Sequence, residues 1–169
     1  MQAELKEDRR VNWPVKPKPW VVATDGSADH VAGLGAHAWV ARDGQKGSSC
    51  EAGVTSTMAE WAAIEAALHA APDGRPIIIY SDFRTAVKVI SRVIEGRWVD
   101  ERYPGLDPAV AATIQRLREL LANKDVTIIW IRSHTGHRNS PALLNKSADH
   151  LARATLRRTR YYSSEHYVI

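Results

Sequence analysis

The chain has very little cysteine: Cys50 is the single residue of that type. One cysteine cannot form an intramolecular disulfide, which excludes the class of small secreted domains stabilised by disulfides. The chain also lacks any apolar run of membrane-spanning length, and its first twenty residues are charged rather than apolar, which argues against a secretory signal. We therefore expect a cytoplasmic protein that does not associate with a membrane.

No internal repeat and no low-complexity tract interrupts the 169 residues, of which 44% are hydrophobic. A chain of this length and composition can bury one substantial core, so we expect a single domain. Neither sign of charge dominates, because 23 Lys and Arg against 19 Asp and Glu leave a net charge of +4. This modest excess suits a polyanionic partner without requiring one, and nothing indicates an obligate protein partner.

The two ends differ in composition from the rest of the chain. The first residues are charged and then proline-rich, in "VNWPVKPKPW", and proline disfavours a helix. We expect residues 1–19 to form an extension, residues 20–158 to form the domain, and residues 159–169 to form a C-terminal tail.

Hydrophobic periodicity and turn residues predict the elements of the domain. Strands are expected over Trp20–Ser27, 35–44, 45–54, 75–82 and 125–133, and helices over 56–71, 83–95, 109–123 and 145–158. Asp43-Gly44 reads as a hairpin turn, Ser56 or Thr57 as a helix N-cap, and residues 134–144 as a loop. The continuous apolar run at 75–82 is typical of a strand covered on both faces. The order βββαβααβα predicts an α/β fold with a five-stranded mixed sheet flanked by helices.

Two strands that are otherwise apolar end on a carboxylate. The run "VVATD" ends on Asp25, and the run "IIIYSD" ends on Asp82. If these strands are parallel neighbours, both acids emerge at the carboxyl end of the sheet, where open α/β sheets bind their ligands. Two acids in equivalent positions therefore suggest a site.

Two further acids lie on the apolar faces of predicted helices. Glu60 shares a face with Ala63 and Ile64, and Asp149 aligns with Ala152 in the last helix. Gathering like charges in a partly desolvated place costs several kcal/mol unless they are protonated or a cation joins them. Oxygen-only ligands favour Mg²⁺ or Mn²⁺ over zinc, and two such ions about 4 Å apart form a clamp for phosphoryl displacement.

Each acid also has an ordinary structural explanation. Asp25 could begin a turn with Gly26, Glu60 could be a surface acid, Asp82 could cap the following helix, and Asp149 could pair with Arg153. The combination of four such acids in this order of elements favours the metal interpretation. A zinc cluster built from His134, His137 and His150 is disfavoured, because no cysteine accompanies the histidines.

Five segments together resemble the motifs of the type 1 ribonuclease H family: "TDGS" at 24–27, "MAEWAAIEAAL" at 58–68, "YSDF" at 80–83, "WIRSHTGH" at 130–137 and "NKSADHLARAT" at 145–155. The resemblance implies a ribonuclease H-like fold and an endonuclease that cuts the RNA strand of an RNA–DNA hybrid, leaving 5′-phosphate and 3′-hydroxyl ends. It implies two Mg²⁺ ions as cofactor, with Mn²⁺ as a substitute.

By the same resemblance, Asp25 bridges both ions and Asp149 completes the site of the ion that activates water. Glu60 and Asp82 then hold the ion that stabilises the leaving oxygen. His134 matches the family's loop histidine, which assists proton transfer or product departure, and is expected to be catalytic.

Substrate contacts are expected from several kinds of residue. Gly26 and Ser27, with Glu60, would meet 2′-hydroxyl groups of the RNA. The hydroxyl groups before the first helix suit a phosphate of the DNA strand, and Asn145 would steady the loop near Asp149. The hydroxyl residues before the first helix are Thr55, Ser56 and Thr57. Trp98 is expected to stack on a sugar or base. The tryptophans expected in the core are Trp20, Trp39, Trp61 and Trp130.

The connection at 96–108 lacks the lysine-rich handle of many cellular members, because acids offset Arg97 and Arg102. The sequence is therefore similar to handle-less members, and a substitute grip could come from Lys16 and Lys18 or from the arginines near the C-terminus, Arg153, Arg157, Arg158 and Arg160. Two alternatives stay open: a nuclease of the same fold with DNA specificity, and a non-catalytic nucleic-acid-binding module that would not need four acids.

Overall fold

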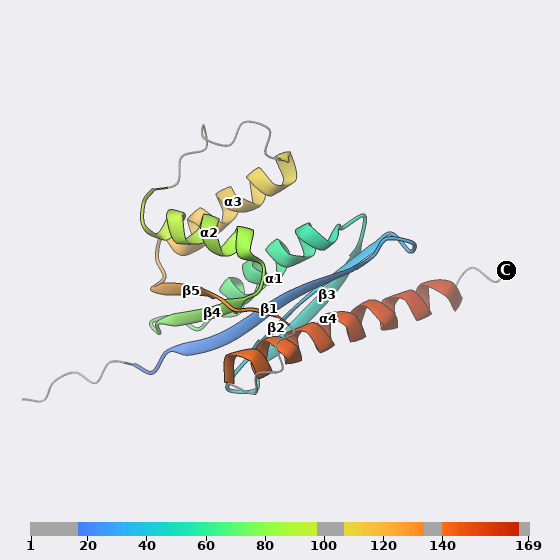
Figure 1. Cartoon of the computed structure of the whole chain (residues 1–169), viewed down its shortest axis with the longest axis horizontal. Coiled ribbons are helices and arrows are strands. Elements are labelled where there is room, and N and C mark those ends of the chain that lie inside the picture. Colours follow the sequence, from blue (N-terminus) through green and yellow to red (C-terminus); the bar gives the residue numbers. More distant parts are fainter. Residues whose placement is uncertain (1–16, 98–106, 134–139, 166–169) are drawn as a thin grey trace, which may run out of the picture.

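The computed structural model describes residues 17–97, 107–133 and 140–165 (Figure 1). Its elements are β1 (Trp20–Asp29), β2 (Leu34–Ala41), β3 (Lys46–Ala52), α1 (Ser56–Ala70), β4 (Ile77–Ser81), α2 (Arg84–Ile94), α3 (Pro108–Leu121), β5 (Val126–Trp130) and α4 (Ser140–Glu165). The strands form one sheet in the order β3-β2-β1-β4-β5. Strand β1 is antiparallel to β2 and parallel to β4. The predicted five-stranded mixed sheet and the order of elements are confirmed.

The pairing of β1 with β4 fixes where the two strand-end acids lie. Thr24 of β1 is the register partner of Ser81 of β4, the last pair of this parallel ladder. Asp25 follows Thr24 and Asp82 follows Ser81, so both acids lie just beyond the last pair, at the same end of the sheet. This is the arrangement expected for parallel neighbours.

Helices α1 and α4 cover opposite faces of the sheet. Side chains alternate between the two faces along a strand, and a Cβ on Gly26 would meet the backbone of α1. Register partners point to the same face, so Asp25, Ala38 and Ser48 share the face opposite to that of Gly26. Thr155 of α4 donates a hydrogen bond to Ser48, which places α4 on this second face. The α1 face holds the core with α2 and α3, and its largest fully buried side chains include Trp20, Trp61, Ile64, Leu68 and Ile79.

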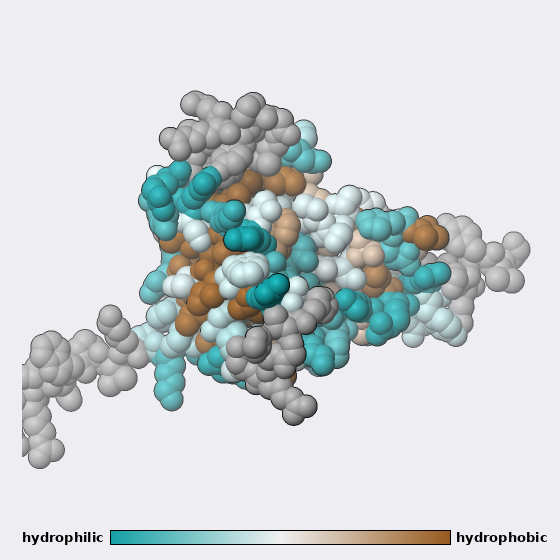
Figure 2. All heavy atoms as spheres, in the orientation of Figure 1, coloured by the Kyte–Doolittle hydropathy of each residue, from teal (hydrophilic) through white to brown (hydrophobic). Residues whose placement is uncertain are grey.

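The other face of β4 and β5 is less covered than predicted. Ile77, Ile79 and Ser81 are buried, whereas Ile78 and Tyr80 are partly exposed, because α4 packs mainly on β1, β2 and β3. The expectation that this strand is covered on both faces is therefore wrong for the described residues. The expectation that Trp130 is a core residue is also wrong, since it is 41% exposed. Figure 2 shows hydrophobic residues gathered over β4 and β5.

Several helix ends differ from the predictions. Thr55, rather than Ser56 or Thr57, caps α1, and its hydroxyl accepts a hydrogen bond from the Met58 N–H. Helix α4 begins at Ser140 and ends at Glu165, so it includes residues expected in a loop and in a C-terminal tail. Proline is tolerated in a first helical turn, where Pro141 lies. In the described residues, every helix is too short or too polar to cross a lipid bilayer.

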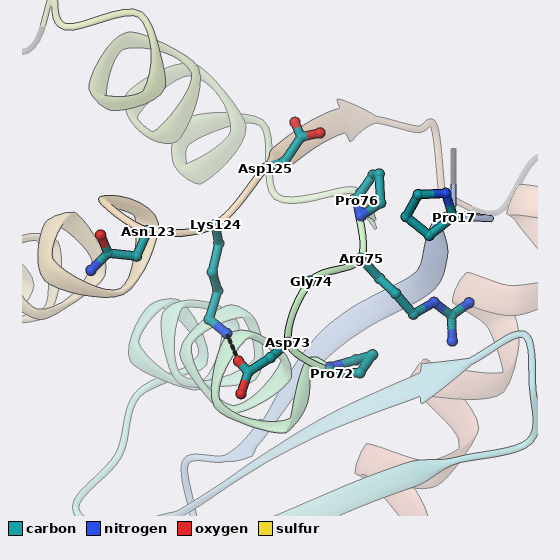
Figure 3. A pocket seen from close by; sticks show the side chains of 9 residues that line it. All are labelled: Pro17, Pro72, Asp73, Gly74, Arg75, Pro76, Asn123, Lys124 and Asp125. Atoms are coloured by element: carbon teal, nitrogen blue, oxygen red, sulfur yellow. Dashed lines mark ion pairs between the residues drawn. The ribbon is translucent and has the colours of Figure 1, made fainter. Parts of the chain in front are cut away.

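A pocket of about 370 Å³ lies at the opposite end of the parallel strands from Asp25 and Asp82 (Figure 3). Its lining residues directly precede β1, β4 and β5. Lys124 pairs with Asp73 across it at 3.6 Å, and the Arg75 guanidinium donates hydrogen bonds to the carbonyls of Lys18 and Pro19. Because open α/β sheets bind ligands at the carboxyl ends of their strands, this pocket is separate from the site that the acids indicate.

Candidate active site

Three carboxylates converge at the carboxyl end of β1 and β4. Asp25 lies near the end of the paired part of β1, Glu60 lies in the first turns of α1, and Asp82 directly follows β4. One oxygen from each of the three lies within 4.8 Å of the other two. The structure thus brings together three of the four acids that the sequence singles out.

Gly26 allows α1 to approach β1 closely enough for this. A Cβ at position 26 would lie 2.4 Å from the Glu60 backbone nitrogen and 2.6 Å from the Ala59 carbonyl carbon. No side chain fits such a space without moving the helix. Gly26 therefore sets the separation between α1 and β1, which places Glu60 beside Asp25.

The gathered charges raise the pKa values of two of these acids. Burial, and then the charges of Asp82 and Asp149, raise the pKa of Asp25 from 3.8 to about 7. Burial, and then the charges of Asp25 and Asp82, raise the pKa of Glu60 from 4.5 to about 10. Both effects disfavour the ionised form. In the folded protein without a cation, the cluster therefore holds protons at neutral pH.

The donor set fits a divalent cation. Glu60 Oε2 is buried and has no hydrogen-bond partner among the described residues, although a buried polar atom is normally paired. Asp25 Oδ1 accepts a hydrogen bond from the Gly26 N–H at 2.9 Å. Carboxylate oxygens without nitrogen or sulfur are the ligands preferred by Mg²⁺ and Mn²⁺. A bound cation would satisfy both the unpaired oxygen and the excess negative charge.

Asp149 lies beside this cluster but outside its 4.8 Å limit. It lies close enough to Asp25 to raise the pKa of that acid, through its charge and a side-chain hydrogen bond. Its Oδ1 is 2.6 Å from the Arg153 Nε. The ion pair with Arg153, which was the ordinary explanation for this acid, is therefore present. The contact with Asp25 is present as well, so Asp149 belongs to the neighbourhood of the site.

Asn145 ties α4 to the strand that carries Asp25. It is buried, and its amide nitrogen donates to the Thr24 carbonyl oxygen at 3.3 Å. The sequence predicts that Asn145 steadies a loop, whereas the structure places it within α4 and against β1. The bond joins the two elements one residue before Asp25.

Trp130 contacts the site from β5, and sequence reasoning missed this role. Its indole N–H donates to the Asp82 carbonyl oxygen at 3.1 Å, and the Arg84 guanidinium lies over its ring, 5.2 Å from the centroid. The signal was available, because Trp130 ends a strand parallel to β4 and pairs with Ser81. Its ring and its hydrogen bond brace the backbone of Asp82.

The predicted substrate residues lie around the cluster in different settings. Gly26 and Ser27 are partly exposed on β1 beyond Asp25, and the hydroxyl residues at the start of α1, Thr55, Ser56 and Thr57, are exposed. Asp82 is not a helix cap, because Phe83 occupies the N-cap of α2. His134 and Trp98 lie outside the described residues.

Comparison with known proteins points to one family. The RNase H family model matches residues 17–157. The chain is 28% identical over 137 residues to proteins named ribonuclease H from two strains of Tropheryma whipplei, Twist and TW08/27. Each alignment covers 79% of this chain and 81% of the relative. With a mixed five-stranded sheet and a cluster of acids at its carboxyl end, the chain belongs to the RNase H family.

Proposed function

We propose that the protein is an endoribonuclease that hydrolyses the RNA strand of RNA–DNA hybrids. The observation that carries this proposal is the convergence of Asp25, Glu60 and Asp82 within 4.8 Å in a chain of the RNase H family. Asp149, whose charge raises the pKa of Asp25, supplies the fourth acid. A module that only bound nucleic acid would gain nothing from such repulsion, because clustered acids repel phosphates.

The four carboxylates would supply ligands for two Mg²⁺ ions, for which Mn²⁺ can substitute. Asp25 would contribute to both ions, Glu60 and Asp82 to one, and Asp149 to the other. When bound, two such ions stabilise the charge on the attacking and leaving oxygens of an in-line displacement at phosphorus. In the proposed reaction an oxygen of water joins the phosphorus and the P–O3′ bond breaks. The products are a 5′-phosphate and a 3′-hydroxyl.

Other residues of the chain would hold and orient this site. Asn145 joins α4 to β1, and Trp130 holds the backbone of Asp82. Gly26, Ser27 and Glu60 would meet 2′-hydroxyl groups, which distinguish RNA from DNA. Thr55, Ser56 and Thr57 stand at the exposed N-terminus of α1, where backbone N–H groups favour a phosphate of the DNA strand. His134 would assist proton transfer or product departure, and Trp98 would stack on a sugar or base.

Cleavage of a labelled hybrid tests the proposal. The full chain is incubated with an RNA–DNA hybrid, duplex DNA and duplex RNA, each with Mg²⁺ and with EDTA, and the ends of the products are mapped. We expect Mg²⁺-dependent cleavage of the RNA strand of the hybrid, leaving 5′-phosphates. Preferential cleavage of duplex DNA would indicate a DNA nuclease of the same fold, and binding without cleavage of any substrate would indicate a non-catalytic module.

A further inference from the structure

Helix α4 carries Asp149 beside the acid cluster and then continues well past it to Glu165. Two contacts hold this continuation against the sheet. The Thr155 hydroxyl donates to Ser48 Oγ at 2.8 Å, and Arg160 pairs with Asp29 at the end of β1 at 3.0 Å. Figure 1 shows α4 running alongside β1. Residues 155–160 of α4 therefore pack against the sheet as a continuation of the helix that carries Asp149.

The arginines of this extension differ in which side of the helix they occupy. A helix turns about 100° per residue, so Arg153 and Arg160 lie within about 40° of Asp149 around the axis, and Arg157 lies about 80° from it. Arg158 lies about 180° from Asp149. All four arginines are exposed. Arg157 therefore stands next to the side that faces the active site, and Arg158 stands on the opposite side.

These arginines also differ in whether an acidic side chain already neutralises their charge. Arg153 is paired with Asp149 and Arg160 with Asp29. Neither Arg157 nor Arg158 has a carboxylate within ion-pair distance among the side chains of residues 17–97, 107–133 and 140–162. An exposed, unneutralised cation near a cluster of acids fits a polyanion that has to approach those acids.

Two arginines on the α2–α3 side of the molecule already have acidic partners. Arg97 is paired with Glu95, and Arg116 with Glu65 at 2.6 Å. Arg97 and Arg116 therefore have less charge to offer a phosphate than Arg157 has.

We propose that one side of α4, defined by Arg153, Arg157 and Arg160, binds the phosphate backbone of the nucleic acid, with Arg157 making the main contact. This inference rests on the proposed function, because the hybrid is the partner. Arg157 lies about 12 Å along the helix axis from Asp149. For a duplex that follows the helix, the contact falls roughly three to four base-pair steps from the cut.

The test compares two arginine substitutions that remove the same charge from the same helix. Binding of a labelled RNA–DNA hybrid is measured against salt concentration with the full chain carrying Asp25→Asn, which prevents cleavage. We expect Arg157→Gln to weaken binding about three- to tenfold at low salt and to lower the salt slope by about one. Arg158→Gln, the matched control, should change neither by more than about twofold.

Melting temperatures show whether both variants are folded, and Arg157→Glu should give a larger loss than Arg157→Gln because it reverses the charge. Equal effects of Arg157→Gln and Arg158→Gln, or no effect of either, would overturn the inference. Cleavage by the unsubstituted chain is measured separately. If the hybrid is cut while the two variants behave alike, the proposed phosphate contact on α4 is refuted and the proposed function stands. If the hybrid is neither bound nor cut, both fail.

Discussion

The Arg153 guanidinium lies 2.6 Å from the Asp149 carboxylate, four residues away on the same helix. The same carboxylate lies beside Asp25 and raises the pKa of that acid. Asp149 therefore has two partners, one cationic and one acidic. A divalent ion that takes Asp149 as a ligand therefore competes with Arg153 for the negative charge of this carboxylate.

Removing this competitor should tighten Mg²⁺ binding. An exposed ion pair is worth up to about 1 kcal/mol, so we expect Arg153→Gln to raise the affinity of the metal-free protein for Mg²⁺ by about two- to fivefold. Arg153→Lys keeps the charge and should stay close to the unsubstituted protein. Arg158→Gln removes a charge from the far side of α4 and serves as the control. Titration calorimetry measures all four proteins, and weaker binding by Arg153→Gln would contradict the competition.

Asp25→Asn should abolish cleavage while leaving hybrid binding in place. An amide keeps the shape of the side chain but loses the negative charge that holds divalent ions, so we expect a loss of at least about 10³-fold in rate. Glu65→Gln provides the control, because Glu65 also lies on α1 but pairs with Arg116 away from the cluster. Cleavage rates and filter binding are compared, and activity retained in Asp25→Asn would refute its assignment as a ligand.

The stability of the metal-free protein should fall as pH rises. Asp25 has a pKa of about 7 when folded and an ordinary value of 3.8, so the unfolded chain releases this proton at lower pH. The contribution of the protonated carboxyl is complete below about pH 4 and is lost between about pH 4 and 7, while Glu60 extends the loss toward pH 10. We expect a decrease on the order of 1–3 kcal/mol, measured by unfolding in EDTA at several pH values.

Two comparisons isolate the cause of this decrease. Asp25→Asn has no carboxyl to ionise at this position, so its unfolding free energy should depend less on pH and exceed that of the unsubstituted chain at pH 8. Saturating Mg²⁺ should restore the stability of the unsubstituted chain at high pH, since a bound ion favours the ionised acids. Parallel pH profiles for the two proteins would show that Asp25 is not the source.

Gly26→Ala should damage both stability and the cluster. Its Cβ would lie 2.4 Å from the Glu60 nitrogen, so α1 has to move away from β1, at a cost of about 1–3 kcal/mol. Mg²⁺ affinity should fall because Glu60 moves with the helix. Ser27→Ala, at the next position, is the control for unfolding. A Gly26→Ala protein with unchanged melting temperature and Mg²⁺ affinity would show that the close approach is unimportant.

Much of the fold was predictable because its signals are local. The apolar runs that end on Asp25 and Asp82, and the proline and glycine at Pro72 and Gly74 that stop α1, are readable along the chain. Which strands a helix covers, in contrast, depends on packing between segments that are distant in the sequence. Ile78 and Tyr80 look like residues of a doubly covered strand, yet they are partly exposed because α4 crosses other strands. Trp130 lies on the other face, with Ser81, but it ends β5 and is 41% exposed.

The candidate site shows a similar division. The spacing of Glu60 on α1 was enough to place it toward the sheet, and the structure puts it beside Asp25. Sequence left two interpretations of Asp149, metal ligand and ion pair; the structure contains the ion pair with Arg153 and also places Asp149 beside Asp25. Helix α4 extends beyond both expected ends because neither glycine nor proline follows Arg158, and because Pro141 is compatible with a first turn.

The register between Thr24 and Ser81 has a consequence for how length variation can be tolerated. One residue added between Trp20 and Asp25, or between Ile77 and Asp82, would displace one acid by about 3.3 Å and turn it to the opposite face. Additions at the Asp43-Gly44 turn or at Asp73-Gly74 leave this ladder untouched. Relatives of this protein should therefore vary in length at those turns while keeping the two strand segments at constant length.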